Sequence, residues 1–255
     1  MKILCIGDVV GNSGVDFLCC HLPSLKRSLG ADIVIVNGEN ADKSGTGLTH
    51  HSAEDILAHG ADVITTGNHC LRRTNEDYYT ETDLVLMPAN HPAVPTKTGA
   101  CTLGVGNKRV DVFNLSGVAF MENYDNPFKT LDELLKNSDA RFKILDFHAE
   151  STAEKRAMAF YADGKLSAMF GTHTHVPTAD GCIMPKKMGY ITDVGMTGAQ
   201  NSVIGVVPSL AIQKQMLHTP VKFEVSPNDC EMDCVLFTLD DESGKCIEVK
   251  QIFEK

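Results

Sequence analysis

The chain has 255 residues, of which 43% are hydrophobic and 22% are charged, and its formal net charge is −10. This length and composition fit a single globular domain with a full hydrophobic core over residues 1–255. The negative charge argues against a protein that binds long nucleic acids, because such proteins usually present a basic face. A small anionic substrate remains compatible with this charge if metal ions supply a local positive field.

The same sequence argues against a membrane or secreted protein. Its apolar segments are far too short to cross a bilayer, and Asp8 and Asp16 interrupt any signal-peptide core in the first 20 residues. The nine cysteines are odd in number and form no Cys-x-x-Cys pair, which argues against a disulfide framework or a thiolate zinc site. We therefore expect a cytoplasmic protein.

The first predicted strand covers residues 2–6 and leads into Gly7-Asp8. A helix should follow, since apolar residues recur at helical spacing from Val15 to Leu25. The glycines of this stretch match neither a dinucleotide-binding fingerprint nor a P-loop. Asp8 directly follows the strand, where an aspartate is either a turn or capping residue or a ligand at the end of a parallel strand.

Two further apolar strands end in polar side chains in the same way. The second covers residues 31–36 and is followed by Glu39-Asn40, and the third covers 61–66 and is followed by Asn68-His69. A helix over 52–59 lies between them, with Ser52 as its predicted N-cap. Residues 70–82 are polar and predict a solvated helix or loop, and a fourth short strand follows at 84–87.

The middle of the chain changes pattern. Two β segments at 98–104 and 109–115, joined by a glycine-containing turn, predict an antiparallel hairpin. Residues 119–127 predict an irregular loop of the kind that often carries function. A helix is expected over 130–136.

The next strand covers residues 142–147 and leads into His148. Side chains two positions apart on a strand point the same way, so Asp146 and His148 should face the same side. A helix is expected over 152–162, with Ser151 as its cap and Glu154 at the matching position of a capping box.

An apolar strand at 168–170 leads into Gly171-Thr172-His173-Thr174-His175. The same two-residue period predicts that His173 and His175 point into one space while Thr174 turns away. Converging imidazoles are a common part of metal sites, although the isolated motif is equally compatible with two solvated loop histidines.

The remainder of the chain is expected to be rich in short β segments. The sequence predicts strands at 181–184 and 189–192, a loop at 193–198, a helix at 209–217, and antiparallel strands at 221–225, 232–239 and 246–253.

Strands that alternate with helices predict a largely parallel sheet with right-handed crossovers. Ligands of such sheets bind at the carboxyl ends of the strands, which is where the polar side chains gather. The candidate donors outnumber the four or so that close around one structural ion, so two ions fit better. None of the donors is a thiolate, which favours iron, manganese or zinc. A pair of such ions can activate a bridging hydroxide and assist phosphoryl displacement.

The order of these motifs resembles that of the calcineurin-like metallophosphoesterases, and more closely that of the YmdB-like bacterial phosphodiesterases. The likeness covers essentially the whole chain and rests on five motifs: Gly7-Asp8-Val9-Val10-Gly11, Asn37-Gly38-Glu39-Asn40, Gly67-Asn68-His69, Asp146-Phe147-His148-Ala149-Glu150 and Gly171-Thr172-His173-Thr174-His175-Val176-Pro177-Thr178.

The resemblance implies a four-layer α/β/β/α sandwich and a centre of two metal ions, with iron expected first and manganese or zinc also fitting. It implies phosphodiester substrates, including cyclic nucleotides such as 2′,3′-cAMP, attacked by a hydroxide that bridges the metals. It also implies a homodimer or homotetramer. By position, one ion would be held by Asp8, Glu39, Asn40 and His175, the other by Glu39, Asn68, His148 and His173, and His69 would protonate the leaving oxygen.

The sequence departs from the family pattern near the expected entrance to the site. Val10 stands where the wider superfamily has a histidine, a loss that the closer branch shares, and His91 stands where a tyrosine is usual. The stretch at 70–73, Cys70-Leu71-Arg72-Arg73, replaces residues that often include a tryptophan and an acid. These changes concern substrate preference more than the class of chemistry.

Several alternatives stay open at this level. The protein could be a regulatory nucleotide-binding protein with a structural metal centre, or a phosphomonoesterase or protein phosphatase. A pocket closed by the 119–127 loop would favour a small nucleotide, whereas an open cleft would favour protein substrates. Asp146 and Asp193 are expected either to orient ligand histidines as hydrogen-bond acceptors or to cap loops.

Overall fold

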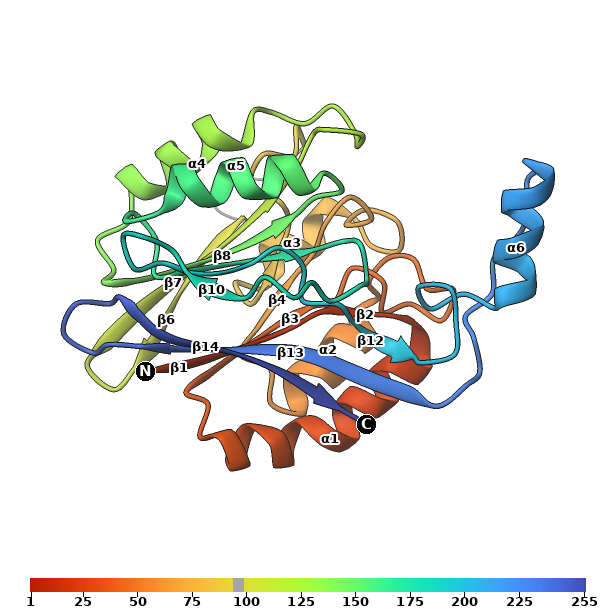
Figure 1. The fold of residues 1–255 in the computed structure, drawn as a ribbon, viewed down its shortest axis with the longest axis horizontal. Helices are drawn as coiled ribbons and strands as arrows, with labels where there is room; N and C mark the ends of the chain where they lie inside the picture. The colour runs from red at the N-terminus through yellow and green to blue at the C-terminus, as the bar shows by residue number, and fades with distance from the viewer. Residues whose placement is uncertain (94–98) are drawn as a thin grey trace.

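The computed structural model describes residues 1–93 and 99–255, and it contains two stacked β-sheets with helices on the outer faces (Figure 1). The eight-stranded sheet has the order β2-β12-β13-β1-β3-β4-β5, with β14 paired to β13. Its strands are β1 (Lys2–Ile6), β2 (Asp8–Val9), β3 (Ile33–Asn37), β4 (Val63–Thr65), β5 (Val85–Leu86), β12 (Met196–Ala199), β13 (Cys230–Leu239) and β14 (Cys246–Glu254).

The six-stranded sheet has the order β10-β11-β9-β8-β7-β6. The neighbouring pairs β7/β8, β8/β9 and β9/β11 are parallel, and β6 pairs antiparallel with β7 in the predicted hairpin. Its strands are β6 (Ala100–Val105), β7 (Lys108–Ser116), β8 (Phe142–His148), β9 (Ala168–Thr172), β10 (Cys182–Ile183) and β11 (Gly189–Ile191).

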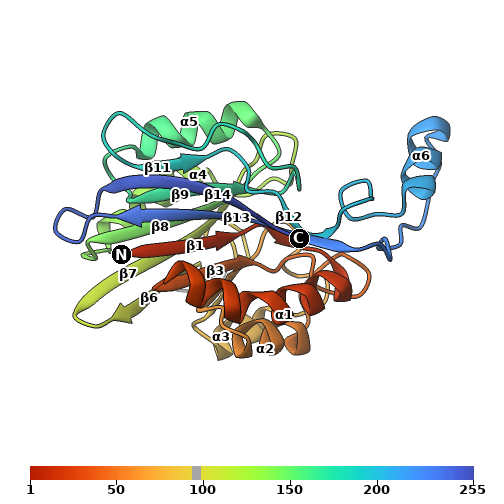
Figure 2. The ribbon, with the colours of Figure 1, turned by 60° about the horizontal axis from the view of Figure 1, so that its bottom comes forward.

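Helices cover the outside of both sheets, as Figure 2 shows. On one side lie α1 (Gly11–Leu29), α2 (His50–Ala58) and α3 (Glu76–Glu81), and on the other lie α4 (Pro127–Lys136) and α5 (Thr152–Ala162). This arrangement confirms the four-layer α/β/β/α sandwich. The sixth described helix, α6 (Pro208–Leu217), stands apart from these layers.

The central strands are apolar at nearly every position because both of their faces are buried. On β1, Ile3 and Cys5 pack into the core between the two sheets, whereas Leu4 and Ile6 pack into the core beneath α1 and α2. Such continuous apolar runs identify buried strands but do not reveal how many sheets they form. The strand order alone therefore predicts the parallel pairing seen from β1 to β5 and from β7 to β9, but it does not predict that these strands divide between two sheets.

Three local predictions are also wrong. Residues 196–198 of the predicted 193–198 loop belong to β12, which pairs in parallel with β2. Residues 221–225 form no strand, although Val225 makes an isolated bridge to Val206. The cap of α2 is Thr49, whose side chain accepts from the Ser52 backbone N–H, because the Ser52 hydroxyl instead donates to the Ala41 carbonyl.

Other local predictions are confirmed. Ser151 caps α5 and accepts from the Glu154 backbone N–H, and residues 119–126 lack helix and strand. The capping box itself is not formed, because the Glu154 carboxylate accepts from the Val118 and Ala119 backbone N–H groups instead. The start of the predicted hairpin strand, residue 98, lies outside the described residues. Among residues 1–93 and 99–255, no helix combines the length and apolar character that a membrane span requires.

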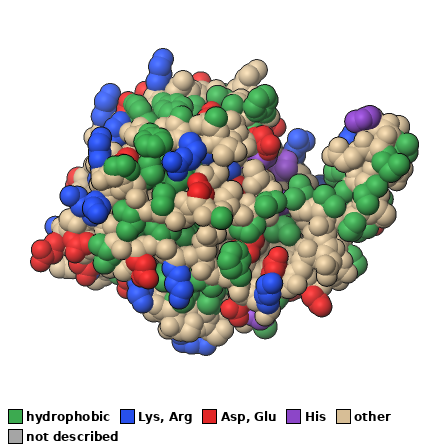
Figure 3. Space-filling model, in the orientation of Figure 1, with side chains coloured by type: hydrophobic (Ala, Val, Ile, Leu, Met, Phe, Trp, Pro, Cys, Tyr) green, Lys and Arg blue, Asp and Glu red, His purple; other side chains and the backbone are tan. Residues whose placement is uncertain are grey.

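Residues 200–226, here called the arm, leave the body of the molecule after β12 and return to β13 (Figure 1). The arm contains α6, and Ala211 is the buried residue of that helix. Figure 3 shows hydrophobic side chains along its surface, among them the exposed Ile212, Met216 and Leu217.

A buried carboxylate in the larger sheet predicts a dependence of stability on pH. Asp233, on β13, is 3% exposed, and burial raises its pKa to about 7. The Met196 backbone N–H and Lys255 oppose that rise, whereas Glu231 and Asp193 add to it. In the unfolded chain the pKa should be about 3.9. The folded state therefore binds more protons between these values, and the free energy of unfolding falls as pH rises through that window.

We predict that Asp233→Asn removes this dependence, because the amide cannot ionise and can still accept from Met196. Urea unfolding at pH 5 and pH 8 should show that the variant gains stability relative to wild type at the higher pH. Asp139→Asn, at a side chain that is 80% exposed, serves as the control. It should change the free energy of unfolding by the same amount at pH 5 and at pH 8. An equal difference between wild type and Asp233→Asn at both pH values would contradict the prediction.

Candidate active site

The polar side chains predicted at the strand ends form one continuous cluster. His148, at the end of β8 in the smaller sheet, reaches Glu39, just after β3 in the larger one. The two side chains are buried, with His148 Nε2 3.3 Å from Glu39 Oε1. Both sheets therefore contribute to the cluster, which is why donors from opposite ends of the chain meet. All eight predicted site residues belong to it: Asp8, Glu39, Asn40, Asn68, His69, His148, His173 and His175.

Two close approaches explain the glycines of these motifs. A Cβ at Gly67 would collide with the His148 ring and the Glu39 carboxylate, and a Cβ at Gly171 would collide with the Thr192 carbonyl. Both positions therefore need glycine for space: a side chain at Gly67 would push His148 and Glu39 apart, and one at Gly171 would displace the backbone that leads from β11.

The first group of donors surrounds His148. Its Nε2 lies 3.1 Å from Asn68 Oδ1 and 3.0 Å from His173 Nδ1, in addition to the Glu39 contact. One ligand atom each from Glu39, His148 and His173 fits within the spread that a single metal ion spans. This group is a candidate metal site with mixed nitrogen and oxygen donors.

The second group lies around Asp8. His175 Nε2 is 3.7 Å from Asp8 Oδ1 and 3.1 Å from Asn40 Nδ2. Asn40 Nδ2 also donates to Glu39 Oε1 at 3.2 Å. Glu39 therefore stands between the two groups and contacts members of both.

A relay of hydrogen bonds fixes the tautomer of His148. The Thr172 hydroxyl donates to Asp146 Oδ1 at 2.8 Å, so its oxygen is left to accept from His148 Nδ1 at 2.9 Å. The ring proton then sits on Nδ1, and the Nε2 lone pair points at the first group. Asp146 thus lies on the same side as His148, as predicted, and orients it through Thr172 rather than directly.

His173 is oriented by a carboxylate. Its Nε2 lies 3.1 Å from Glu150 Oε2, and an ionised carboxylate only accepts. The His173 proton therefore sits on Nε2, and its Nδ1 lone pair faces the Nε2 lone pair of His148 at 3.0 Å. Two lone pairs at this separation repel each other unless a cation or an added proton lies between the rings.

The buried charges of the cluster point the same way. Asp8 Oδ1 is buried and has no hydrogen-bond partner among the described residues. Burial lowers the pKa of His148, but the carboxylates of Glu39 and Asp8 outweigh it and raise that pKa to about 9. Burial and the neighbouring His148 lower the pKa of His173 to about 3. The cluster therefore holds more hydrogen-bond acceptors than hydrogen-bond donors, and its nitrogen and oxygen atoms fit bound metal cations.

The two histidines of the last motif converge for a different reason from the predicted one. The strand β9 ends at Thr172, and His173 and His175 have φ values of 101° and 63°. Non-glycine residues seldom adopt such angles, which occur mainly where a site constrains the backbone. As a result, the His173 ring joins the first group and the His175 ring joins the second. Thr174 lines the same pocket instead of turning away.

A buried ion pair supports this strained loop. Lys155 Nζ donates to Asp193 Oδ2 at 2.7 Å and to the Thr172 carbonyl at 2.7 Å, and both charged side chains are buried. Asp193 also accepts from the Thr174 backbone N–H at 3.1 Å, between the two histidines. Asp193 therefore holds the loop backbone and contacts neither imidazole directly.

His69 lies at the edge of the cluster and lines the pocket. Its side chain is 27% exposed, its backbone N–H donates to Glu39 Oε2 at 3.1 Å, and its Nδ1 lies 2.9 Å from Asn40 Oδ1. The other ring nitrogen, Nε2, is the one left to exchange a proton with a bound molecule.

The cluster opens into a cavity of about 410 Å³, the size of a small-molecule site. One wall carries five of the clustered side chains: Glu39, Asn40, His69, His173 and His175. A further part of the wall comes from residues 204–206 and 223–225 of the arm, not from the predicted 119–127 loop. The sequence did not reveal these arm residues, because 221–225 predicted an ordinary strand and residues 204–206 carried no recognisable signal.

The unusual stretch at 70–73 acts on the rim of this cavity. Arg73 Nε donates to Asp42 Oδ1 at 3.1 Å, and its Nη2 donates to the Ser44 hydroxyl at 2.8 Å. Residues 44–46 line the cavity, so Arg73 braces part of its wall without facing the cluster.

Comparisons with known proteins agree with this geometry. The sequence model of the family described as YmdB-like protein matches residues 4–252. The 2′,3′-cyclic-nucleotide 2′-phosphodiesterase of Bacillus subtilis is 38% identical over 255 residues, covering 99% of this chain and 96% of that protein. The crystal structure of a novel phosphatase from Mycoplasma pneumoniae superposes with a TM-score of 0.93 at 34% identity, covering 99% of this chain and 92% of that one.

A more distant match extends the fold to larger proteins. The NAD nucleotidase of Haemophilus influenzae has a TM-score of 0.58 at 13% identity, covering 99% of this chain and 49% of that one. This likeness concerns the fold alone.

The Lys155–Asp193 pair generates a stability prediction. Lys155→Met keeps most of the apolar stem but leaves Asp193 buried without its cation, which should lower the free energy of unfolding by about 3–5 kcal/mol. Lys165→Met is the matched control, because Lys165 pairs with Asp132 at the surface, where a pair contributes about 1 kcal/mol or less. Urea unfolding measures both, and equal losses in the two variants would show that the buried pair has no special role.

Proposed function

This chain belongs to the YmdB-like protein family, and from that premise we propose that it is a metal-dependent phosphoric diester hydrolase. The observation that carries the proposal is the pair of donor groups that share Glu39 and lie beside His69 in one cavity. The name of the Bacillus subtilis relative supports cyclic nucleotides such as 2′,3′-cAMP as substrates. A walled cavity of about 410 Å³ favours such small molecules over protein substrates.

The proposed ligands follow the two groups. Asp8, Glu39, Asn40 and His175 would hold one ion, and Glu39, Asn68, His148 and His173 would hold the other. Iron is the metal we expect first, and manganese or zinc also suit these donors. When bound, such a pair of ions lowers the pKa of water and neutralises phosphate charge.

Asn40 links metal binding to the state of His69. An amide ligates a metal through its oxygen, but Asn40 presents Nδ2 to Glu39 and His175 and Oδ1 to His69. For Asn40 to act as a ligand, its amide must turn over. Its Nδ2 would then donate to His69 Nδ1, and the neutral ring would carry its proton on Nε2, where a general acid needs it.

The proposed reaction opens a 2′,3′-cyclic phosphate by adding water. A water oxygen forms a bond to phosphorus while the bond between phosphorus and the 2′ oxygen breaks, which leaves a 3′-phosphate. His69 Nε2 gives its proton to the departing 2′ oxygen, and the proton released by the water restores the acid by way of solvent. Asn40 and Glu39 hold the His69 ring and backbone in place for this step. Assembly into a homodimer or homotetramer and a cytoplasmic location stay predictions.

We predict that His69→Ala lowers kcat for 2′,3′-cAMP by about 10²- to 10⁴-fold, the usual contribution of a general acid. The metal content of the purified variant, measured by mass spectrometry, should match wild type, since His69 is outside both proposed ligand sets. The loss should be smaller for bis-p-nitrophenyl phosphate, whose leaving group needs no proton.

The control is His51→Ala, at a side chain that is 85% exposed and away from the cavity; it should keep wild-type turnover. Full activity of His69→Ala on 2′,3′-cAMP would remove the acid role. A wild-type protein that binds metals and nucleotides but turns over no ester would favour the regulatory alternative.

A further inference from the structure

The cavity has a second, apolar wall that the proposed chemistry does not use. Its side chains are Val10 from the body and four residues of the arm: Ile204, Val206, Phe223 and Val225. A site that held only a phosphate group would need no such surface. Apolar walls facing a few polar groups are typical of sites for larger organic ligands.

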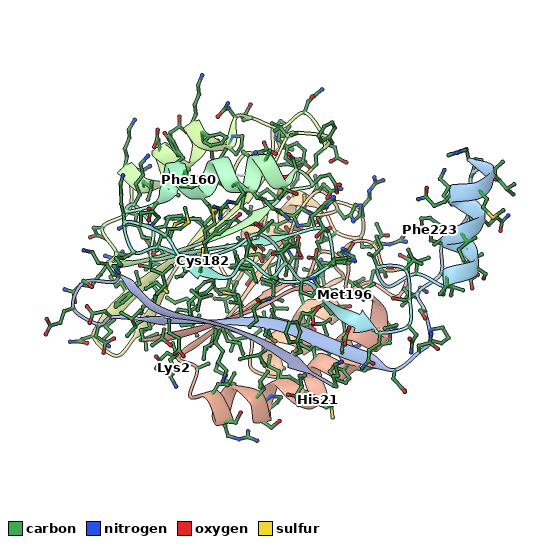
Figure 4. The ribbon with its side chains drawn as sticks, viewed as in Figure 1. Lys2, His21, Phe160, Cys182, Met196 and Phe223 are labelled. Atoms are coloured by element: carbon green, nitrogen blue, oxygen red, sulfur yellow. The ribbon has the colours of Figure 1, made fainter. Side chains whose placement is uncertain are left out.

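Two members of this wall stay open to solvent. Phe223 is 45% exposed and Ile204 is 48% exposed, although both line the cavity. Phe223 lies where the chain returns from α6 to the body (Figure 4). An aromatic ring half exposed at the edge of a polar site offers a flat surface to a planar ligand.

The wall is fixed to the body and is not a loose flap. Val225 bridges to Val206 and packs against Gly11 and Gly45, where a Cβ on either glycine would lie 2.8 and 3.0 Å from Val225. These glycines leave the room that Val225 occupies. Phe223, two residues away, is thereby anchored beside the cavity.

The wall is also tied to the metal cluster. The Ile204 carbonyl lies 3.0 Å from His175 Nδ1, which fixes the proton on that nitrogen and leaves Nε2 for the second group. Ile204 has a φ of 49°, a strained value for a β-branched residue. Strain of this kind persists where surrounding contacts enforce it, often at functional sites. One turn of the arm therefore serves both the apolar wall and a candidate ligand.

We propose that Phe223, together with Ile204 of the same cavity wall, forms a subsite that binds the nucleobase of the substrate by stacking. This inference rests on the proposed function, because the phosphate must lie at the cluster for the base to reach the arm. Stacking tolerates every base, since each has a π-face. The subsite should therefore discriminate only weakly among bases, with a modest preference for purines because their rings offer a larger area for stacking.

The test compares 2′,3′-cAMP with glycerol 1,2-cyclic phosphate, which has the same five-membered cyclic diester and no base. In Phe223→Ala the ratio of kcat/KM for 2′,3′-cAMP to kcat/KM for glycerol 1,2-cyclic phosphate should fall about 10-fold, as expected for one lost stacking contact. The fall should come from a higher KM for 2′,3′-cAMP, and Phe223→Tyr should restore the wild-type ratio. Met216→Ala is the control, because Met216 is an exposed apolar residue of α6 outside the cavity.

A binding measurement separates this proposal from the proposed function. Calorimetry with adenosine 3′-monophosphate and with inorganic phosphate should show that Phe223→Ala weakens the first about 10-fold relative to the second. If wild type hydrolyses neither ester, the proposed function fails, and calorimetry still decides the subsite. If Phe223→Ala changes neither the ratio of kcat/KM values nor the ratio of binding affinities, the nucleobase subsite is wrong. If both ratios stay unchanged but the mass of the assembly in solution differs between Phe223→Ala and wild type, Phe223 contributes to contacts between copies of the chain instead.

Discussion

The contact between Glu39 and His148 is the constraint on which the site depends, because it joins the two sheets at their carboxyl edges. Glu39 belongs to the larger sheet and His148 to the smaller, and both side chains are buried. The Asn37 amide adds a second buried link by donating to Asp146 at 3.0 Å. Beneath these links, apolar side chains such as Ile35 and Ile144 set the spacing of the sheets. The core therefore determines whether the two donor groups share Glu39.

This arrangement concentrates unfavourable electrostatics in one place. A buried Asp8 oxygen without a hydrogen-bond partner among the described residues, and two facing imidazole nitrogens, oppose folding unless cations or an added proton occupy the cluster. Natural proteins depart from local consistency mainly at functional sites and compensate elsewhere. Here the compensation includes the buried Lys155–Asp193 pair, which holds the loop of His173 and His175. The same cluster of buried polar groups therefore causes the backbone strain at His173 and His175 and supplies the candidate metal ligands.

Much of the fold and of the cluster could be predicted because burial on both faces leaves long apolar strands, and each strand ends in its functional residue. Periodicity could not distribute the strands between two sheets. It also gave the wrong reason for the convergence of His173 and His175, since their positive φ values depend on tertiary contacts. The arm escaped prediction because its apolar residues, such as Phe223, face a cavity that only the folded chain creates.

The central claim is that strand ends from two sheets build one centre for two metal ions around Glu39. The most direct test is a crystal structure of the purified protein with anomalous data collected at the absorption edge of the metal that mass spectrometry identifies. We expect two peaks on either side of the Glu39 carboxylate, one near His148 and His173 and the other near Asp8 and His175. A single peak, or none at Glu39 after reconstitution with iron, manganese and zinc, would contradict the account.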